Sequence, residues 1–288
     1  MADALGTLRR FLLLTGLYYA GAVLASLYLR TPDDVTLFWP SAGLGFAVAV
    51  TLGMRWAVVV PFAMCVLHLT VLKVPDVFVP YSVASNTIAT LAAGWYANRE
   101  RRPDGLHLRT ADGLMLLRGG ILLGLVGAAI GTVGLIHAGM VLPSEAGRAY
   151  VTWALGDLLG VATLAPACTV LLSRGGLGQE GLWRDRVGPR EQTLWSIGLI
   201  LSLVAIVTAG QSGNLYALGL VSLPLALLLW SAVRFSPLTT MVGTILVVTF
   251  LSLLTGLGLG GFTRPLTLLD AVLQWLETHP EPAQEICL

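Results

Sequence analysis

One carboxylate lies well inside an apolar stretch of this 288-residue chain: Asp157, in the run Trp153-Ala-Leu-Gly-Asp-Leu-Leu-Gly. An aspartate at mid-membrane depth costs about 2.5–3.5 kcal/mol, so it needs a partner or a water-filled cavity. Two interpretations follow, and the sequence leaves both open. Asp157 either makes a structural hydrogen bond to a neighbouring helix or takes part in ligand binding or signalling.

Several other polar or aromatic side chains interrupt the apolar stretches. A lone histidine is more often structural than functional, and aromatic residues near span ends often belong to the interfacial belt. The further candidates for ligand binding or signalling are Trp39, Pro40, His68, Asn86, His137 and Trp153. An enzyme would use Asp157 with a histidine as acid–base partners, but no nucleophile accompanies them. We therefore expect no catalytic residues.

The three cysteines show no C-x-x-C spacing, and two of them lie within apolar runs. A thiol in such a run usually behaves as a small hydrophobic group. No histidine, cysteine or carboxylate spacing matches a known pattern of metal ligands. The sequence therefore predicts neither a metal site nor a cofactor.

The composition excludes an ordinary soluble domain. Hydrophobic residues make up 56% of the chain and charged residues 11%, whereas soluble domains carry roughly a quarter charged residues. The net charge of +1 provides no basic face for nucleic acid. The expected environment is the lipid bilayer.

Apolar runs of about the length that crosses a bilayer, near 20 residues, recur along the chain. They lack the period-two alternation of barrel strands, so helices are predicted. The fold class is an all-α, polytopic bundle of about nine transmembrane helices, with eight to ten as the range. The predicted spans are 11–29, 37–53, 56–72, 81–97, 119–142, 150–172, 193–210, 215–233 and 237–260.

The basic residues predict the orientation. With the N-terminus inside, 13 of the 17 lysine and arginine residues fall on inner segments. The four on outer segments are Arg30, Lys73, Arg148 and Arg264, and Lys73 is the single lysine of the chain. This bias predicts an inner-membrane protein with a cytoplasmic N-terminus. The first apolar run is longer than a signal peptide core, which favours an uncleaved span.

In the inner loop 99–118, four leucines among charges predict a short interfacial helix.

The polar candidates are predicted to lie at similar depths in the bilayer. The even-numbered spans run inward and place Trp39, Asn86 and Asp157 in their outer halves, while outward-running spans place His68 and His137 near their outer ends. An outward-facing polar pocket would give this pattern, and so would anchoring at the membrane interface.

Glycines predict close helix packing. They recur every three or four residues on one face of the fifth span, and two more flank Asp157, which allows backbones to approach closely. The residues are Gly120, Gly124, Gly127, Gly131, Gly134, Gly156 and Gly160.

Four stretches together resemble the membrane-associated sensor domain family, type one (MASE). They are Leu-Phe-Trp-Pro-Ser-Ala-Gly-Leu-Gly at 37–45, Ser-Asn-Thr at 85–87 followed by Trp-Tyr-Ala-Asn-Arg at 95–99, Thr-Ala-Asp-Gly at 110–113, and the run around Asp157 with Ala-Pro at 165–166. The last is similar to the family's most distinctive signature, and the resemblance covers about residues 10–260.

The resemblance implies a bacterial sensory module that perceives a small ligand or a membrane partner. Such modules are usually fused to histidine-kinase, GGDEF or EAL domains, so a phosphorelay or cyclic-di-GMP output is implied. The implied partners are a signalling protein or fused output domain and a second copy in a homodimer. We expect residues 1–260 to form the sensor domain and 261–288 a short amphipathic tail without an output domain.

One departure from the family concerns the C-terminus. Nine spans would place it outside, whereas family members deliver a cytoplasmic one. The chain is then truncated before a last span, or it signals through a partner, or the count is off by one. The alternative function is a small-solute transporter or permease subunit with Asp157 as the carrier. Against it, the inner halves of the spans lack polar residues that would continue a path.

Overall fold

The computed structural model describes residues 2–29, 36–100, 110–173, 182, 187–211 and 217–257. All regular elements in these ranges are helices, which confirms the all-α prediction. The elements are α1 (Ala2–Tyr28), α2 (Pro40–Thr51), η1 (Met54–Val58), α3 (Val59–Thr70), α4 (Phe78–Glu100), α5 (Thr110–His137), η2 (Pro143–Glu145), α6 (Ala146–Leu172), α7 (Pro189–Gln211), α8 (Ala217–Leu220), α9 (Ser222–Arg234) and α10 (Pro237–Gly256). The predicted tail 261–288 lies outside the described residues.

Each predicted span contains helix, but the helices differ in length. Within the described ranges, five are long and apolar enough to cross a membrane: Ala4–Tyr28, Asp112–His137, Pro143–Leu172, Pro189–Gly210 and Pro237–Gly256. The apolar helices at Pro40–Thr51, Met54–Thr70 and Ser222–Arg234 are shorter. Helix α4 is long enough to cross a membrane but is less apolar than those five. The chain is a membrane helix bundle, and its number of crossings stays a prediction.

The start of α5 corrects one prediction. The helix begins at Thr110, nine residues before the predicted start at Gly119, so 110–118 is part of α5 and does not form a separate interfacial helix. Met115 and Leu116 are buried there. The Gly119-Gly120 pair does not interrupt the helix because neighbours fill its space: Gly119 lies against the ring of Phe46 and Gly120 against Val161. The remainder of the predicted interfacial helix lies outside the described residues.

Helix α2 forms the centre of the bundle. Every residue from Pro40 to Val50 is buried, and α2 packs against α1, α4 and α6. Alanine, glycine and serine occupy much of the helix, and their small side chains allow neighbours to approach from all sides. A helix enclosed in this way contacts protein along its length, and this relieves it of the need to match the bilayer thickness.

The chain enters α2 through a non-helical segment, residues 36–39. Its backbone is paired with two helices: the Leu37 amide donates to the Leu29 carbonyl at 2.9 Å, and the Trp39 amide donates to the Gly156 carbonyl at 3.1 Å. Irregular backbone at membrane depth is tolerated only where protein or a water-filled cavity surrounds it. This segment shortens α2 relative to the predicted span 37–53.

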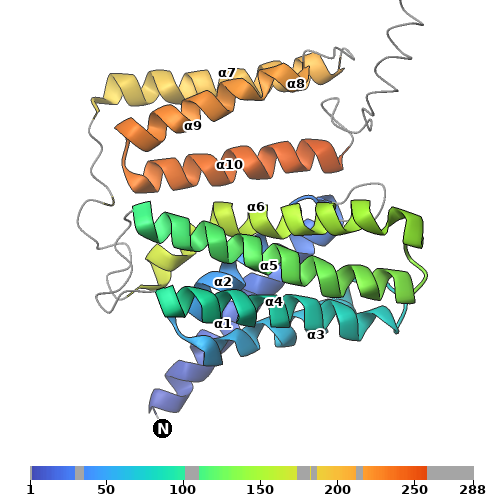
Figure 1. Ribbon diagram of the computed structural model, residues 1–288. Coiled ribbons are helices and arrows are strands. Elements are labelled where there is room, and N and C mark those ends of the chain that lie inside the picture. Colours follow the sequence, from blue (N-terminus) through green and yellow to red (C-terminus); the bar gives the residue numbers. More distant parts are fainter. Residues whose placement is uncertain are drawn as a thin grey trace, which may run out of the picture.

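The helices form two regions (Figure 1). Helices α1 to α6 pack around one large core, and α7 to α10 lie along one side of α6 around a smaller core of Trp195, Leu199, Phe235 and Val247. Helix α10 joins the two, since it packs against both α6 and α9.

Candidate ligand-binding site

A pocket of about 130 Å³ lies at one end of the α1–α6 region. Its lining comes from the C-terminal parts of α1, α3 and α5, the N-terminal parts of α4 and α6, and the segments that connect these helices. The lining residues are Ser26, Thr36, Trp39, Met64, Leu72, Lys73, Val74, Phe78, Ser82, Asn86, Leu135, Met140, Trp153 and Asp157. This is the end of the bundle opposite the start of α1, and an N-terminus inside the cell would place the pocket on the outer side.

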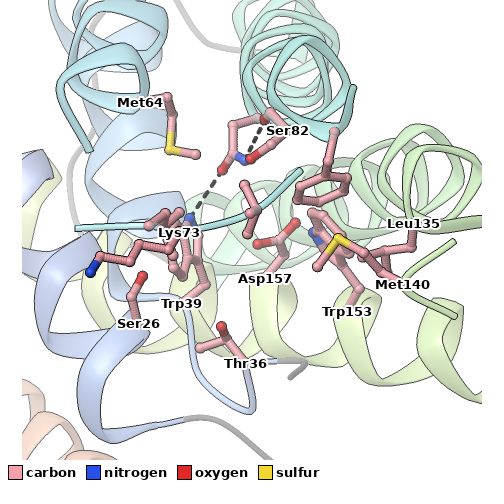
Figure 2. Close-up of a pocket in the computed structure, with 14 residues that line it drawn as sticks. Ser26, Thr36, Trp39, Met64, Lys73, Ser82, Leu135, Met140, Trp153 and Asp157 are labelled. Atoms are coloured by element: carbon pink, nitrogen blue, oxygen red, sulfur yellow. Dashed lines mark hydrogen bonds between the residues drawn. The ribbon is translucent and has the colours of Figure 1, made fainter. Parts of the chain in front are cut away.

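Asp157 contributes a carboxyl group to the lining of this pocket. Its side chain is 3% exposed, and in Figure 2 the carboxylate lies between the side chains of Trp39 and Trp153. Within the described residues, no basic side chain lies at ion-pair distance from it. On its other side the carboxylate meets α5 at Gly127, where an added Cβ would lie 2.8 Å from Oδ2. Gly127 therefore makes room for the carboxylate.

Asn86 fixes one wall of the pocket. Its Oδ1 accepts hydrogen bonds from Trp39 Nε1 at 3.0 Å and from the Tyr18 hydroxyl at 3.2 Å. Its Nδ2 donates to the Ser82 carbonyl at 2.9 Å. These bonds join α1, α4 and the segment before α2, and they use most of the hydrogen-bonding capacity of the Asn86 amide. Figure 2 draws the bonds that reach Trp39 and Ser82 as dashed lines. Asn86 thus orients the Trp39 indole.

Glycines on α2 and α6 hold the Trp39 segment against Asp157's helix. Gly160 lies directly against the Trp39 carbonyl, and Gly43 lies against the Gly160 carbonyl. Gly156 contacts the backbone of Thr36. A side chain at any of these positions would separate the two backbones. Pro40, the first residue of α2, is buried and does not line the pocket.

The predicted packing glycines of α5 lie against residues of α6 and α4. Gly124 lies against the Ala154 carbonyl, Gly131 against the Trp153 ring and Gly134 against Tyr81. With Gly120 and Gly127, these residues bring α5 close to α6 and to the start of α4. These glycines therefore set the position of two pocket residues, Trp153 and Asp157.

The two histidines lie outside the lining. His137 is exposed, and its Nδ1 lies 2.8 Å from the Tyr81 hydroxyl, which ties α5 to α4. His68 is half-buried on α3, and neither ring nitrogen has a hydrogen-bond partner in the described part of the chain. The structure thus brings four of the seven candidates together, namely Trp39, Asn86, Trp153 and Asp157.

Sequence reasoning missed several lining residues. Lys73 is exposed in the α3–α4 connection, and Figure 2 shows its side chain directed away from Asp157. The sequence could have marked Lys73 as a candidate, because it is the single lysine of the chain. Nothing in the sequence marks Ser26, Thr36 and Ser82, since hydroxyl side chains are common in membrane proteins. No group of three or more His, Cys, Asp or Glu side chains in the described ranges is arranged to hold a metal ion.

Comparison with known proteins supports one assignment. The family model MASE1 matches residues 10–263. No curated protein and no solved structure matches the chain. The matched range includes every residue that lines the pocket. This chain belongs to the MASE1 family of membrane sensory domains.

Proposed function

We propose that this chain is the sensory module of a bacterial signalling system in the inner membrane. It binds a small ligand in the pocket between α1 and α6 and passes the bound state to a histidine-kinase or cyclic-di-GMP type output as a change in helix packing. One observation carries the proposal: the pocket contains a carboxylate, Asp157, that is buried and lacks a cationic partner among the described residues.

The surroundings of Asp157 favour ligand binding over a purely structural role. A structural carboxylate in a membrane protein is expected to be paired, because an isolated buried charge is costly. The structure meets that requirement for Asn86, whose amide is hydrogen-bonded on both sides. Asp157 has a hydrogen bond with the Trp153 indole and also lines the cavity, but no opposite charge lies at ion-pair distance from it among the described residues. A group that enters the pocket would supply the interaction that the indole alone does not.

Helix α6 offers a route for the signal. Asp157 and Trp153 lie in its first half, and Pro166 lies inside the helix nine residues further on. Proline lacks the N–H that would bond to the preceding turn, so helices bend at such positions. Ligand contact on one side of Pro166 can therefore change the angle of the other half. The ligand shifts this equilibrium only by its difference in affinity for the two states.

The orientation follows from the charge distribution. With the N-terminus in the cytoplasm, the pocket faces the outside and the far ends of α2, α4 and α6 face the cytoplasm. An external ligand would then act on helices whose other ends are available to an output domain, a partner protein or a second copy.

The test uses the purified full chain in lipid nanodiscs and thermal unfolding across a library of small solutes. Some compounds should raise the unfolding midpoint of the wild type. Asp157→Asn should lose that response, while Asp76→Asn should keep it, because Asp76 is exposed at the same end and does not line the pocket. Equal responses of wild type and Asp157→Asn would reduce Asp157 to a structural role. Solute uptake into vesicles that Asp157→Asn abolishes would instead support a permease subunit.

A further inference from the structure

The pocket combines one buried carboxyl group, that of Asp157, with aromatic surfaces. We propose that it binds a small organic cation, with the ammonium group held between the Asp157 carboxylate and the indole rings of Trp39 and Trp153. This inference specifies the ligand class and rests on the proposed ligand-binding function.

The charge of the site selects the sign of the ligand. Asp157 is 3% exposed, lines the cavity, and has no basic side chain at ion-pair distance in the described ranges. An anionic ligand would place a second negative charge beside it in a medium of low dielectric constant, which is strongly unfavourable. A cation would pair with the carboxylate and supply the opposite charge that its hydrogen bond with Trp153 does not provide.

The aromatic lining favours an organic cation over a metal ion. Trp39, Phe78 and Trp153 all line the pocket, and Phe78 and Trp153 are in edge contact with ring centroids 6.3 Å apart. The faces of indole rings attract ammonium groups, as in sites that recognise quaternary amines. Hard metal ions are usually bound by several carboxylate oxygens, and the described residues contain no group of three or more His, Cys, Asp or Glu side chains that could hold one.

The Trp39 ring is fixed for this role. Its Nε1 donates to Asn86 Oδ1, and its backbone is bonded to Gly156 on α6. The polar edge of the ring is therefore used, and its position relative to Asp157 is set by two independent contacts. Little conformational entropy would be lost at Trp39 when a ligand binds.

Substitution of Lys73 provides a control for which the direction of the change in affinity is predicted. It lines the pocket, is exposed, and its side chain extends away from Asp157, so it leaves the carboxylate unneutralised (Figure 2). Its positive charge opposes the entry of a cation and would favour an anion. Removing the charge should therefore strengthen the binding of an ammonium ligand.

The experiment measures binding by isothermal titration calorimetry to the purified full chain in nanodiscs. The probes are choline and n-butylammonium, and the neutral controls are dimethylbutanol, in which carbon replaces the choline nitrogen, and n-butanol. At least one ammonium probe should bind about tenfold or more tightly than its neutral control, as expected for a close charge pair and cation–π contact. Asp157→Asn should abolish that preference and Asp76→Asn should retain it. Lys73→Gln should raise the affinity by about twofold, the size of a screened surface charge effect.

Equal binding of the charged and neutral probes by the wild type would overturn the proposal, and this comparison needs no variant. Weaker ammonium binding by Lys73→Gln would also overturn it. Should Asp157→Asn fail to fold, Trp153→Phe replaces it, and a loss of about threefold in ammonium affinity is expected from the weaker cation–π surface. If other solutes stabilise the wild type and neither ammonium probe binds, the ligand class is wrong while the sensor function stands. If no solute of any class has an effect, the sensor function itself fails.

Discussion

The α1–α6 and α7–α10 regions bury their helices to different extents. In the most apolar windows of α5 and α6, 56% and 44% of residues are buried, against 22% in each of α7 and α10. Both regions expose large apolar side chains, for example Leu69 at 85% in the first and Leu229 at 72% in the second. The regions therefore differ in their interiors: the central helices of the first enclose a site, whereas the helices of the second bury less of their surface.

The difference comes from residue size at the contacts. In the first region, glycines at Gly43, Gly156 and Gly160 bring backbones together. In the second, the large rings of Trp195 and Phe235 fill the space between helices, with centroids 5.1 Å apart. Close backbone contact allows a polar side chain such as Asp157 to be buried at a defined place. Contacts through large side chains hold helices together without forming such a pocket.

The largest difference in stability between the two regions should come from a pair of glycine-to-alanine substitutions, one in each region. Gly160→Ala would bring a Cβ into the Trp39 carbonyl, which is backbone and has little room to move. We expect a loss of about 3 kcal/mol in stability, as for overpacked cores. Gly198→Ala on α7 meets only Leu227 at 3.7 Å, so it should cause no loss. Unfolding in mixed micelles of increasing SDS content measures both, and similar stabilities for the two variants would contradict the comparison.

An intermediate loss of stability should come from two tryptophan-to-phenylalanine substitutions, one in each region. Trp39→Phe removes the hydrogen bond to Asn86 at 3.0 Å, and Trp195→Phe removes the one to the Leu227 carbonyl at 2.7 Å. Each loss should cost about 1 kcal/mol, the usual net value of a hydrogen bond. Only Trp39→Phe should also weaken the solute-dependent rise in unfolding midpoint. A reduced response in Trp195→Phe would show that the second region takes part in binding.

The smallest effect should come from the ion pair between α7 and α9. Arg234 donates to both carboxylate oxygens of Glu191, at 3.1 and 2.9 Å, on an exposed surface. Exposed pairs contribute little to stability and are screened by salt. Arg234→Gln should leave the unfolding midpoint nearly unchanged at physiological ionic strength, and any difference should shrink as salt rises. A large, salt-independent loss would show that this contact has a structural role comparable to the glycine contacts of the first region.

The helices were largely predictable because hydropathy and glycine spacing act within one segment. The errors occurred where a neighbouring helix decides the outcome. Gly119 and Gly120 suggested a helix start, yet packing against Phe46 and Val161 lets α5 continue through them. Leu37 looked like the beginning of a span, yet hydrogen bonds to Leu29, just after α1, and to Gly156 on α6 accompany a non-helical backbone at residues 36–39. Local sequence contains no information about such partners.

The sequence by itself determined that this protein is a helical membrane bundle of the MASE1 family. It also determined that Trp39, Asn86, Trp153 and Asp157 lie near the same end, because depth along a helix follows from residue number. Only the tertiary structure decided that these four share a cavity with Lys73, that Tyr18 and Asn86 fix the Trp39 ring, and that His68 and His137 stay outside. Whether a side chain faces the cavity depends on the rotation of its helix about the helix axis. That rotation is set by the close contacts of glycines between helices.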